Sequence, residues 1–251
     1  MSSLSGFPPS ADKIARPTMT RPHLLLLPGL LCDARLWQYQ AAALAATTHV
    51  SVADVSDEDS IAAMASAVLA QAPADEFALA GFSLGGYVAL EIFRQAPQRV
   101  LALALLDTSA RPDTDENSES RMQSIRLAAM DFPAVIEGLL PKLVHPAHLD
   151  DPSLLDVIRA MANSQGAQVC INQQRAMIGS VDSRPDLYRI ACPTLVLCGS
   201  ADTITPPEVH REMADAITAS HLAIIETCGH LAPLEQPDAV SKELKNWLAR
   251  L

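Results

Sequence analysis

The amino-acid sequence predicts an α/β protein built on a parallel sheet of about six strands, with helices on both faces. Two observations lead to this prediction. Short aliphatic runs alternate with helical segments, which is the pattern of a parallel sheet covered on both sides. The alternation is interrupted once, over residues 108–190, where we find helical segments but no convincing strand. The predicted architecture therefore includes a helical insertion before the last two strands.

Six aliphatic runs supply the predicted strands. The runs are bounded by residues that end regular structure, such as Pro22 before the first run and Pro28-Gly29 after it. Their positions in order are residues 23–27, residues 49–53, a run that starts at Phe77, residues 100–106, residues 194–198 and residues 222–225.

Helices are predicted between these strands from capping residues and prolines. Asp33 is a favourable N-cap for a helix over residues 33–46. A helix over residues 60–71 stops before Pro73, because the residue that precedes a proline is disfavoured in helical geometry. A closing helix is predicted over residues 237–249.

The interrupted stretch is predicted to be a cap or lid over the carboxyl ends of the strands, where ligands bind in such sheets. It begins with a polar loop, Arg-Pro-Asp-Thr-Asp-Glu-Asn-Ser-Glu-Ser, and continues with helical segments at residues 119–130, 133–140, 152–161 and 166–178. The alternative is that these helices only pack on one another. Some of their apolar residues are expected to line a pocket. The candidates are Met130, Phe132, Leu139, Leu140, Leu143, Met161 and Met177.

The predicted organisation has three parts. Residues 1–20 are rich in serine and proline and are expected to form a flexible tail without the apolar core of a secretory signal. Residues 21–107 and 191–251 are expected to form the core, and residues 108–190 the cap. Met19 remains an alternative start of the chain.

Composition excludes several classes of function. The chain has 251 residues, 49% of them hydrophobic, and a net charge of −11, which argues against nucleic acid or an anionic membrane as a partner. It contains no apolar run as long as a membrane span. The five cysteines are scattered and form no Cys-x-x-Cys pair, so we expect free thiols and a cytoplasmic location.

The most informative motif lies between the strand at Phe77 and the apolar helical pattern that follows it. Gly81-Phe82-Ser83-Leu84-Gly85 matches the Gly-x-Ser-x-Gly pattern of a nucleophile elbow, in which a strained strand-to-helix turn exposes the serine hydroxyl. Glycines fit there because side chains would collide with the crossing strand and helix. The alternative is that Ser83 only caps the helix.

A serine hydroxyl needs a base, and His230 is the histidine in the right place. Among the seven histidines, only His230 directly follows a predicted strand end. Two aspartates that end strands, Asp202 and Asp107, are candidates for the acid that orients the imidazole. We favour Asp202, because a Thr-Ile-Thr-Pro-Pro turn follows it and because the order Ser, Asp, His then holds along the chain. Asp107 would otherwise serve at the hinge of the cap.

Backbone donors for an oxyanion are expected at two positions. One is the N–H of Leu84, which follows the serine. The other is the N–H of Leu30 in the loop after the first strand, since Pro28 has no N–H and Gly29 allows the turn. The alternative is that Pro28-Gly29 forms only a tight turn.

Three motifs together resemble the α/β-hydrolase superfamily. They are the Gly-Phe-Ser83-Leu-Gly-Gly elbow, the Gly-Ser-Ala-Asp202-Thr-Ile-Thr-Pro loop and Gly-His230-Leu-Ala-Pro-Leu-Glu-Gln-Pro near the end of the chain. The likeness covers about residues 21–251 and is greatest to small capped carboxylic-ester hydrolases, the group of microbial esterases, enol-lactonases and acyl-carrier methyl esterases. Relatives commonly carry His-Gly where this chain has Pro28-Gly29, and many have an additional N-terminal hairpin for which this chain has no room.

The resemblance implies a serine hydrolase that cleaves an ester, thioester or lactone through an acyl-enzyme, without a cofactor. Its substrate is expected to be a small molecule with an apolar group. Two alternatives remain open at this point. One is a small-molecule receptor or regulator, or a very slow enzyme, on the same fold, and the other is a carbon–carbon bond hydrolase or perhydrolase that uses the same residues.

No metal site or phosphate-binding loop is predicted. His145 and His148, followed by Asp150 and Asp151, contain ligand-type side chains, but the proline between the histidines and the polar setting favour a loop of the cap. The sequence contains no glycine-rich phosphate motif.

Overall fold

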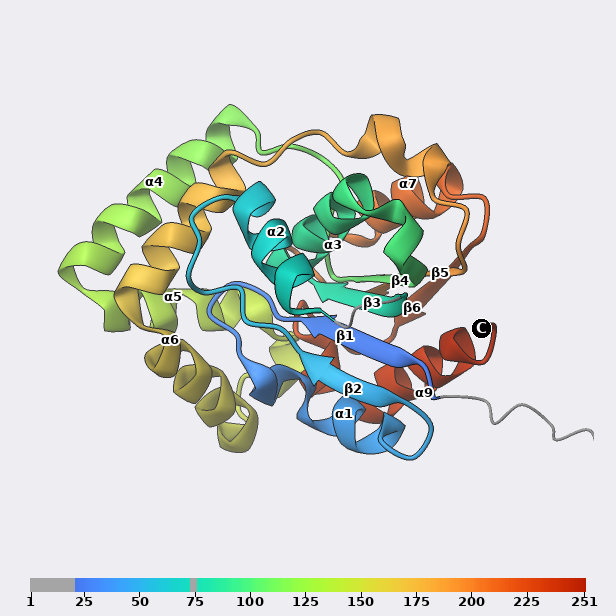
Figure 1. Ribbon diagram of the computed structural model, residues 1–251. Coiled ribbons are helices and arrows are strands. Elements are labelled where there is room, and N and C mark those ends of the chain that lie inside the picture. The colour runs from blue at the N-terminus through green and yellow to red at the C-terminus, as the bar shows by residue number, and fades with distance from the viewer. Residues whose placement is uncertain (1–20, 73–75) are drawn as a thin grey trace, which may run out of the picture.

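The computed structural model describes residues 21–72 and 76–251, and the predicted tail of residues 1–20 lies outside the described residues. Within the described part of the chain, six strands form one parallel sheet with the order β2-β1-β3-β4-β5-β6 (Figure 1). The strands are β1 (His23–Leu27), β2 (His49–Val52), β3 (Phe77–Phe82), β4 (Val100–Leu106), β5 (Thr194–Gly199) and β6 (Ser220–Ile225). The predicted six-stranded parallel sheet is therefore confirmed, with strand ends within two residues of the sequence pattern.

Helices cover both faces of the sheet because alternate residues of each strand point to opposite sides. In β1, Leu24 and Leu26 belong to one buried cluster and Leu25 and Leu27 to the other. The first cluster packs against α1 (Gln38–Leu44) and α9 (Pro237–Leu248). The second packs against α2 (Ile61–Gln71), α3 (Leu84–Gln95) and α7 (Pro207–Ala216).

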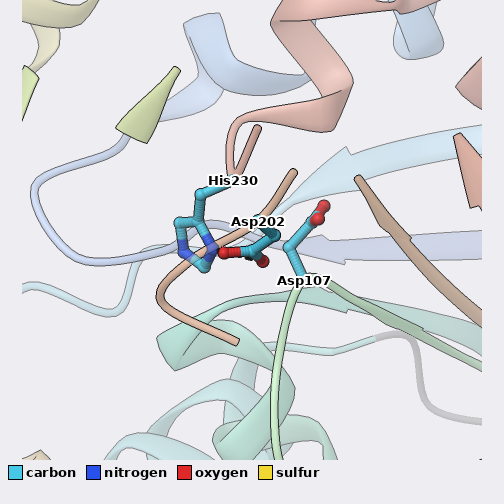
Figure 2. A group of neighbouring side chains, drawn as sticks. All are labelled: Asp107, Asp202 and His230. Carbon is cyan, nitrogen blue, oxygen red and sulfur yellow. Dashed lines mark hydrogen bonds and ion pairs between the residues drawn. The ribbon is translucent and has the colours of Figure 1, made fainter. Parts of the chain in front are cut away.

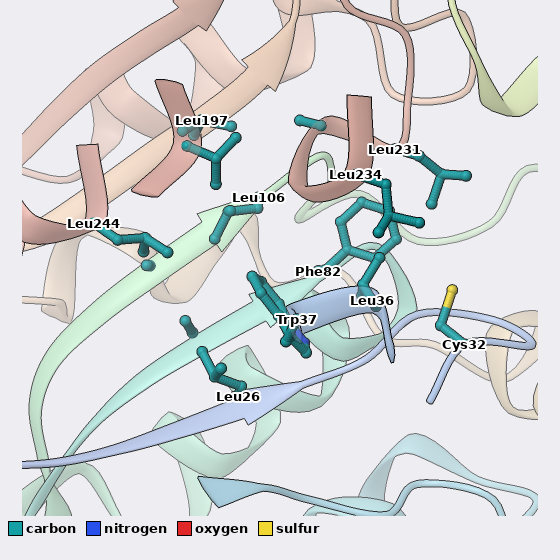
Figure 3. Packing of buried hydrophobic residues seen from close by; sticks show 14 of the residues in the cluster. Leu26, Cys32, Leu36, Trp37, Phe82, Leu106, Leu197, Leu231, Leu234 and Leu244 are labelled. Carbon is teal, nitrogen blue, oxygen red and sulfur yellow. The ribbon is translucent and has the colours of Figure 1, made fainter. Parts of the chain in front are cut away.

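The cluster under α1 and α9 brings large side chains from distant parts of the sequence together. Phe82, at the end of β3, meets Trp37 edge-to-face with ring centroids 6.5 Å apart. Figure 3 shows this pair among leucines of the sheet and of the surrounding helices. Because Phe82 precedes Ser83, this packing anchors the strand end that carries the elbow.

Residues between β4 and β5 form three longer helices: α4 (Asp115–Met130), α5 (Phe132–Leu143) and α6 (Pro152–Ile178). They lie beyond the arrowheads of the strands, at the carboxyl-end edge of the sheet (Figure 1). The two predicted segments at residues 152–161 and 166–178 are the two parts of α6, which is broken at Gly166 with φ 82°. We refer to residues 108–190 below as the insertion.

The predicted polar loop at the start of the insertion is wrong over residues 115–118, because the helix predicted from residue 119 already begins at Asp115. The reason is local: the Thr114 side chain caps α4 by accepting the Asn117 N–H, and Asp115 and Glu116 occupy the first turn. Negative charge at a helix N-terminus is favourable because of the helix dipole. The polar composition of this stretch therefore reflects the exposed first turns of a helix and not a loop.

The remaining helical elements are short. They are the 3-10 helices η1 (Ala34–Trp37), η2 (Pro97–Arg99), η3 (Pro146–His148) and η4 (Arg184–Arg189), together with α8 (Ala232–Glu235). Among the helices described, none is long and apolar enough to cross a membrane.

Candidate functional site

Ser83 stands at a strained turn between β3 and α3. Its backbone adopts φ 52° and ψ −118°, a conformation that residues with a side chain rarely take. The turn is possible because Gly81 and Gly85 pack against each other without side chains: a Cβ on Gly81 would collide with the carbonyl oxygen of Gly85. The strand, turn and helix thus form the elbow that the sequence pattern predicts.

Backbone and side-chain hydrogen bonds hold this strained turn. The Ser83 N–H donates to Leu106 O at 3.0 Å, which ties the elbow to the end of β4. The Ser83 carbonyl accepts the Thr108 hydroxyl at 2.7 Å and the Gly86 N–H at 2.8 Å. With its backbone groups fixed in this way, the serine side chain has a defined position at the strand end.

His230 lies between Ser83 and Asp202. Its Nε2 is 2.9 Å from Ser83 Oγ, and its Nδ1 is 2.8 Å from Asp202 Oδ2. The imidazole is only 2% exposed and packs against the Phe82 ring at a centroid distance of 5.2 Å. The structure therefore brings together the three side chains that were chosen as a set from the sequence.

The loop that carries His230 is attached to the insertion. The N–H groups of His230 and Leu231 both donate to the carbonyl of Leu143, at 2.9 and 3.0 Å. The buried Glu235 accepts the N–H of His145 at 2.7 Å and that of Gly229 at 2.9 Å, and its Oε2 is 2.7 Å from His148 Nδ1. His145 and His148 lie in the connection between α5 and α6, so Glu235 joins this part of the insertion to the loop of His230.

Asp202 is held by four donors. Its Oδ1 accepts the N–H groups of Ile204 and Thr205 at 2.8 and 3.0 Å, and its Oδ2 accepts the Thr205 hydroxyl at 2.7 Å besides facing His230. Burial opposes ionisation of this carboxyl, but the charge of His230 and these hydrogen bonds outweigh burial and lower its pKa. Asp202 is therefore an ionised, fixed acceptor for the imidazole.

Asp107 lies behind Asp202, on the side away from the imidazole (Figure 2). Its Oδ1 accepts the Gly199 N–H at 2.9 Å, while its buried Oδ2 has no partner among the described residues. Burial and the neighbouring Asp202 charge raise the pKa of Asp107 well above its usual value. The surroundings therefore act on the two adjacent carboxyls in opposite directions: they favour the ionised form of Asp202 and the neutral form of Asp107.

Asp107, Asp202 and His230 are also the described residues that come closest to a metal-ligand group, with one ligand atom of each within 4.8 Å of the others. The fit to a cation is poor. Asp202 and His230 already form a direct hydrogen bond of 2.8 Å, which an ion would have to break. The arrangement corresponds instead to an acid that orients an imidazole.

His210, on α7, binds the backbone just after the end of β4. It is fully buried, and its Nε2 accepts the N–H of Thr108 at 3.0 Å, which leaves the ring proton on Nδ1, 3.3 Å from Pro206 O. Burial lowers the pKa of His210 to about 4. A neutral His210 therefore holds Thr108, the residue whose hydroxyl binds the Ser83 carbonyl.

This arrangement predicts an acid-sensitive stability. The unfolded chain binds a proton at His210 below a pKa of about 6.5, whereas the folded chain does not until about 4. His210 should therefore destabilise the fold as the pH falls, by about 2 kcal/mol between pH 7.5 and 5. Urea unfolding at both pH values measures this loss. In His210→Gln, which does not titrate, the loss should be smaller by that amount, and equal losses in the two proteins would contradict the assignment.

The loop after β1 forms a tight turn beside Ser83. The Cys32 N–H donates to Gly29 O at 3.1 Å, and the Leu31 N–H donates to Oε1 of Gln173 at 2.9 Å. The Leu30 N–H, one of the two predicted oxyanion donors, has no acceptor in the described parts of the protein. The other, the Leu84 N–H, belongs to the first turn of α3, whose N–H groups have no partner within the helix.

A cavity of about 530 Å³ opens above Ser83 and His230. Its walls combine the sheet edge with the insertion. Of the apolar candidates, Leu139, Leu143, Met161 and Met177 line it. The others do not: Leu140 is buried in the core, Met130 is 79% exposed and Phe132 packs within the insertion. Polar residues line the cavity where α4 begins, among them Asp113, Asn117, Ser120 and Arg121.

Four residues around the site were not predicted from the sequence: Thr108, His210, Gln173 and Glu235. Glu235 lies within the motif that contains His230, so its position in that motif was an available signal. His210 stands within a helix, and nothing in the sequence around it points to its partner Thr108, 102 positions earlier. Nothing in the local sequence marks Gln173, because its partner Leu31 is 142 positions away.

Residues 24–243 match the sequence profile of the alpha/beta hydrolase family. The chain belongs to this family. The chain resembles the solved structure of a thermophilic esterase from Thermogutta terrifontis, with a TM-score of 0.84 and 30% sequence identity. The match covers 91% of this chain and 90% of that one.

Two curated proteins are also similar in sequence to this chain. The chain is 29% identical over 200 residues to the pimeloyl-[acyl-carrier protein] methyl ester esterase of Neisseria meningitidis serogroup B strain H44/76, and the match covers 75% of this chain and 74% of that protein. It is 24% identical over 257 residues to the biotin biosynthesis bifunctional protein BioHC of Cellvibrio japonicus, and the match covers 93% of this chain. The chain spans about half of that longer protein, 49% of its length.

Proposed function

We propose that this α/β hydrolase is a carboxylic-ester hydrolase, with Ser83 as nucleophile, His230 as base and Asp202 as the acid that orients the imidazole. The observation that carries the proposal is the continuous hydrogen-bonded chain from Ser83 Oγ through His230 to Asp202 Oδ2, with distances of 2.9 and 2.8 Å, at the floor of the cavity. The relatives named as esterases support the same reaction class.

In the proposed reaction, His230 Nε2 takes the Ser83 proton as Oγ attacks the ester carbonyl carbon. The carbonyl electron pair moves to the oxygen, and the N–H groups of Leu30 and Leu84 stabilise this oxyanion. The imidazolium then protonates the departing alcohol, which leaves an acyl-Ser83. Water, activated by His230, hydrolyses the acyl-enzyme by the same steps in reverse order. Asp202 stabilises the imidazolium and fixes its tautomer throughout.

The three-part organisation belongs to the same proposal. Residues 21–107 and 191–251 act as the catalytic core, and residues 108–190 as a cap that closes the cavity over Ser83. Cavity-lining residues from α4, α5 and α6 support this division. A reducing, cytoplasmic setting is proposed with it, supported by the five cysteines, which are all free thiols.

The cavity walls also favour a substrate class. Apolar side chains of the insertion, including Ile136, Ile158 and Met161, line the same cavity as Ser83. Such walls favour an aliphatic group on one side of the ester, and thioesters and lactones of similar size fit the same chemistry. The polar side chains near the start of α4 then face the more polar part of the substrate.

The reaction is tested by incubating the protein with a fluorophosphonate, which traps activated serines, and with p-nitrophenyl esters of increasing acyl length. We expect stoichiometric labelling of Ser83, located by peptide mass spectrometry, together with ester turnover. Absence of both labelling and turnover would overturn the hydrolase assignment and favour a binding protein on the same fold.

A cavity variant tests the substrate class. Met161→Trp places a larger side chain in the wall of the cavity. It should move the acyl-length optimum to shorter chains, because each excluded CH₂ forfeits about 0.8 kcal/mol, or roughly fourfold in kcat/KM. Met122→Trp is the matched control, since Met122 is on the exposed side of α4 and does not line the cavity. An unchanged optimum in Met161→Trp would show that the aliphatic group binds elsewhere.

A further inference from the structure

The loop that follows β1 is packed into the insertion. Leu31, only 4% exposed, belongs to a buried cluster whose other core members are Ala128, Val135, Ile136, Ala162 and Cys170, and Leu30 packs against the same cluster. These partners all lie within the insertion. The leucine side chains of this core loop are therefore held by residues more than 90 positions later in the sequence.

A single side chain of the insertion also controls the backbone of this loop. Gln173, on α6, is fully buried, and its Oε1 accepts the Leu31 N–H at 2.9 Å. Its Nε2 donates to Val55 O at 3.3 Å, so both ends of the amide are engaged. The bond is directed at a strained residue, because Leu31 has φ 57°, in the left-handed region that leucine rarely occupies.

These contacts determine the orientation of one peptide group. The Leu30–Leu31 peptide is held at its N–H by Gln173 and at its carbonyl by the Cys32 thiol, with Sγ 3.4 Å from Leu30 O. The turn closed by Cys32 N–H and Gly29 O leaves the Leu30 N–H without an acceptor among the described residues. The Leu30 N–H belongs to the preceding Gly29–Leu30 peptide, which shares the Leu30 Cα with the peptide that Gln173 holds. A shift of the Leu30–Leu31 peptide would therefore displace the Leu30 Cα and that donor with it.

We propose that Gln173 is a positioning residue of the reaction: it holds the Leu30–Leu31 peptide so that the Leu30 N–H is available to the oxyanion. This inference rests on the proposed function and extends it, because it makes the insertion part of the oxyanion hole as well as a wall of the cavity. Without the Gln173 acceptor, the buried Leu31 N–H loses its partner and the strained φ of Leu31 loses its main restraint.

A purely structural role would look different from a positioning role. If Gln173 only satisfies a buried N–H, its loss lowers the stability of the protein and leaves the turnover of folded molecules unchanged. If it positions the Leu30 N–H, its loss lowers kcat while KM changes little, because the oxyanion exists only in the transition state and the intermediate.

The experiment compares three variants with the wild type at matched concentration. Gln173→Met keeps the length of the side chain and removes the acceptor. Gln173→Glu keeps an acceptor for the Leu31 N–H, and in its protonated form it can also donate to Val55 O. Gln168→Met introduces the same substitution at an exposed position of the same helix and serves as the control.

We expect Gln173→Met to lower kcat by about 10- to 100-fold and to leave KM within about threefold of the wild-type value. The decrease in kcat should be somewhat smaller than the decrease caused by removing an oxyanion donor completely. The affinity for a trifluoromethyl ketone, which forms a tetrahedral adduct, should fall by a similar factor. Gln173→Glu should retain most of the wild-type kcat at acidic pH. As the pH rises and the buried carboxyl ionises, the ratio of its kcat to the wild-type kcat at the same pH should fall. Gln168→Met should match wild type.

Amide hydrogen exchange gives a readout that does not depend on activity. In the wild type the Leu31 N–H should be protected, and in Gln173→Met its exchange should accelerate more than that of core strands. Unchanged kcat in Gln173→Met, or a Leu31 N–H that exchanges equally in both proteins, would overturn the inference. A wild type that neither hydrolyses esters nor reacts with the fluorophosphonate would refute the proposed function, and exchange at Leu31 alone would then decide whether Gln173 holds this peptide.

Discussion

Ser83→Ala is expected to lower kcat for p-nitrophenyl esters by at least about 10³-fold. The residual rate should be the one that substrate binding and the oxyanion donors support without the serine nucleophile. The substitution removes the only atom that forms the acyl bond. It should leave the fold intact, because the bonds that hold the turn, to Leu106 O, Thr108 and Gly86, use the Ser83 backbone. Initial rates over the ester series measure the effect.

A control and a contrary outcome make this result decisive. Ser66→Ala removes an exposed hydroxyl from α2 that does not line the cavity, and it should turn over esters like the wild type. If Ser83→Ala retained wild-type rates and the fluorophosphonate still labelled the protein, another residue would be the nucleophile. The Ser83 side chain makes no capping hydrogen bond to α3, so such a result would leave its hydroxyl without a role in the reaction.

Asp202→Asn is expected to lower kcat by about 10³- to 10⁴-fold, the second large effect. Asparagine keeps the shape of the side chain and can still accept the N–H groups of Ile204 and Thr205 at the position of Oδ1. The other end can carry an NH₂ group, which would face His230 Nδ1 and favour the imidazole tautomer that has no free lone pair for the Ser83 proton. The pH dependence of kcat for wild type and variant measures this loss.

Asp107→Asn is the matched comparison, and it should lower kcat less than about tenfold. Because burial and the charge of Asp202 raise the pKa of Asp107 and so favour its neutral form, an amide of the same shape should change the charge around His230 very little. A reversed result, with a large loss in Asp107→Asn and a small one in Asp202→Asn, would assign the orienting acid to Asp107. Comparable large losses in both would show that the two carboxyls act as one coupled unit.

The residues at the floor of the site could be predicted from the sequence because of a general property of parallel sheets. Ser83, Asp202 and His230 each follow a strand, and the carboxyl ends of parallel strands lie on one edge. The aliphatic runs located these strands to within two residues. Glycines on either side of Ser83 then distinguished a strained elbow from an ordinary turn.

Contacts between the insertion and the core could not be predicted in the same way. Gln173 reaches Leu31 because two parts of the chain with no shared periodicity pack together, and a glutamine in a helix carries no local sign of its partner. The start of α4 was missed for a different reason. Its first turn is polar because it faces solvent, and composition alone does not separate an exposed helix from a loop.

The insertion accepts backbone hydrogen bonds from two core loops beside the reaction centre, the loop of His230 and the loop after β1. These bonds limit where segments of this chain can be exchanged for the corresponding segments of related hydrolases. A chimera that exchanges residues 108–190 at the strand ends removes Leu143 O, which accepts the N–H groups of His230 and Leu231, and Gln173 Oε1, which accepts that of Leu31. Three buried donors then depend on what the foreign segment supplies. Crossover points that respect these pairs lie inside the insertion, so that a new substrate pocket can be grafted while residues around 143–148 and 173 stay with their own core.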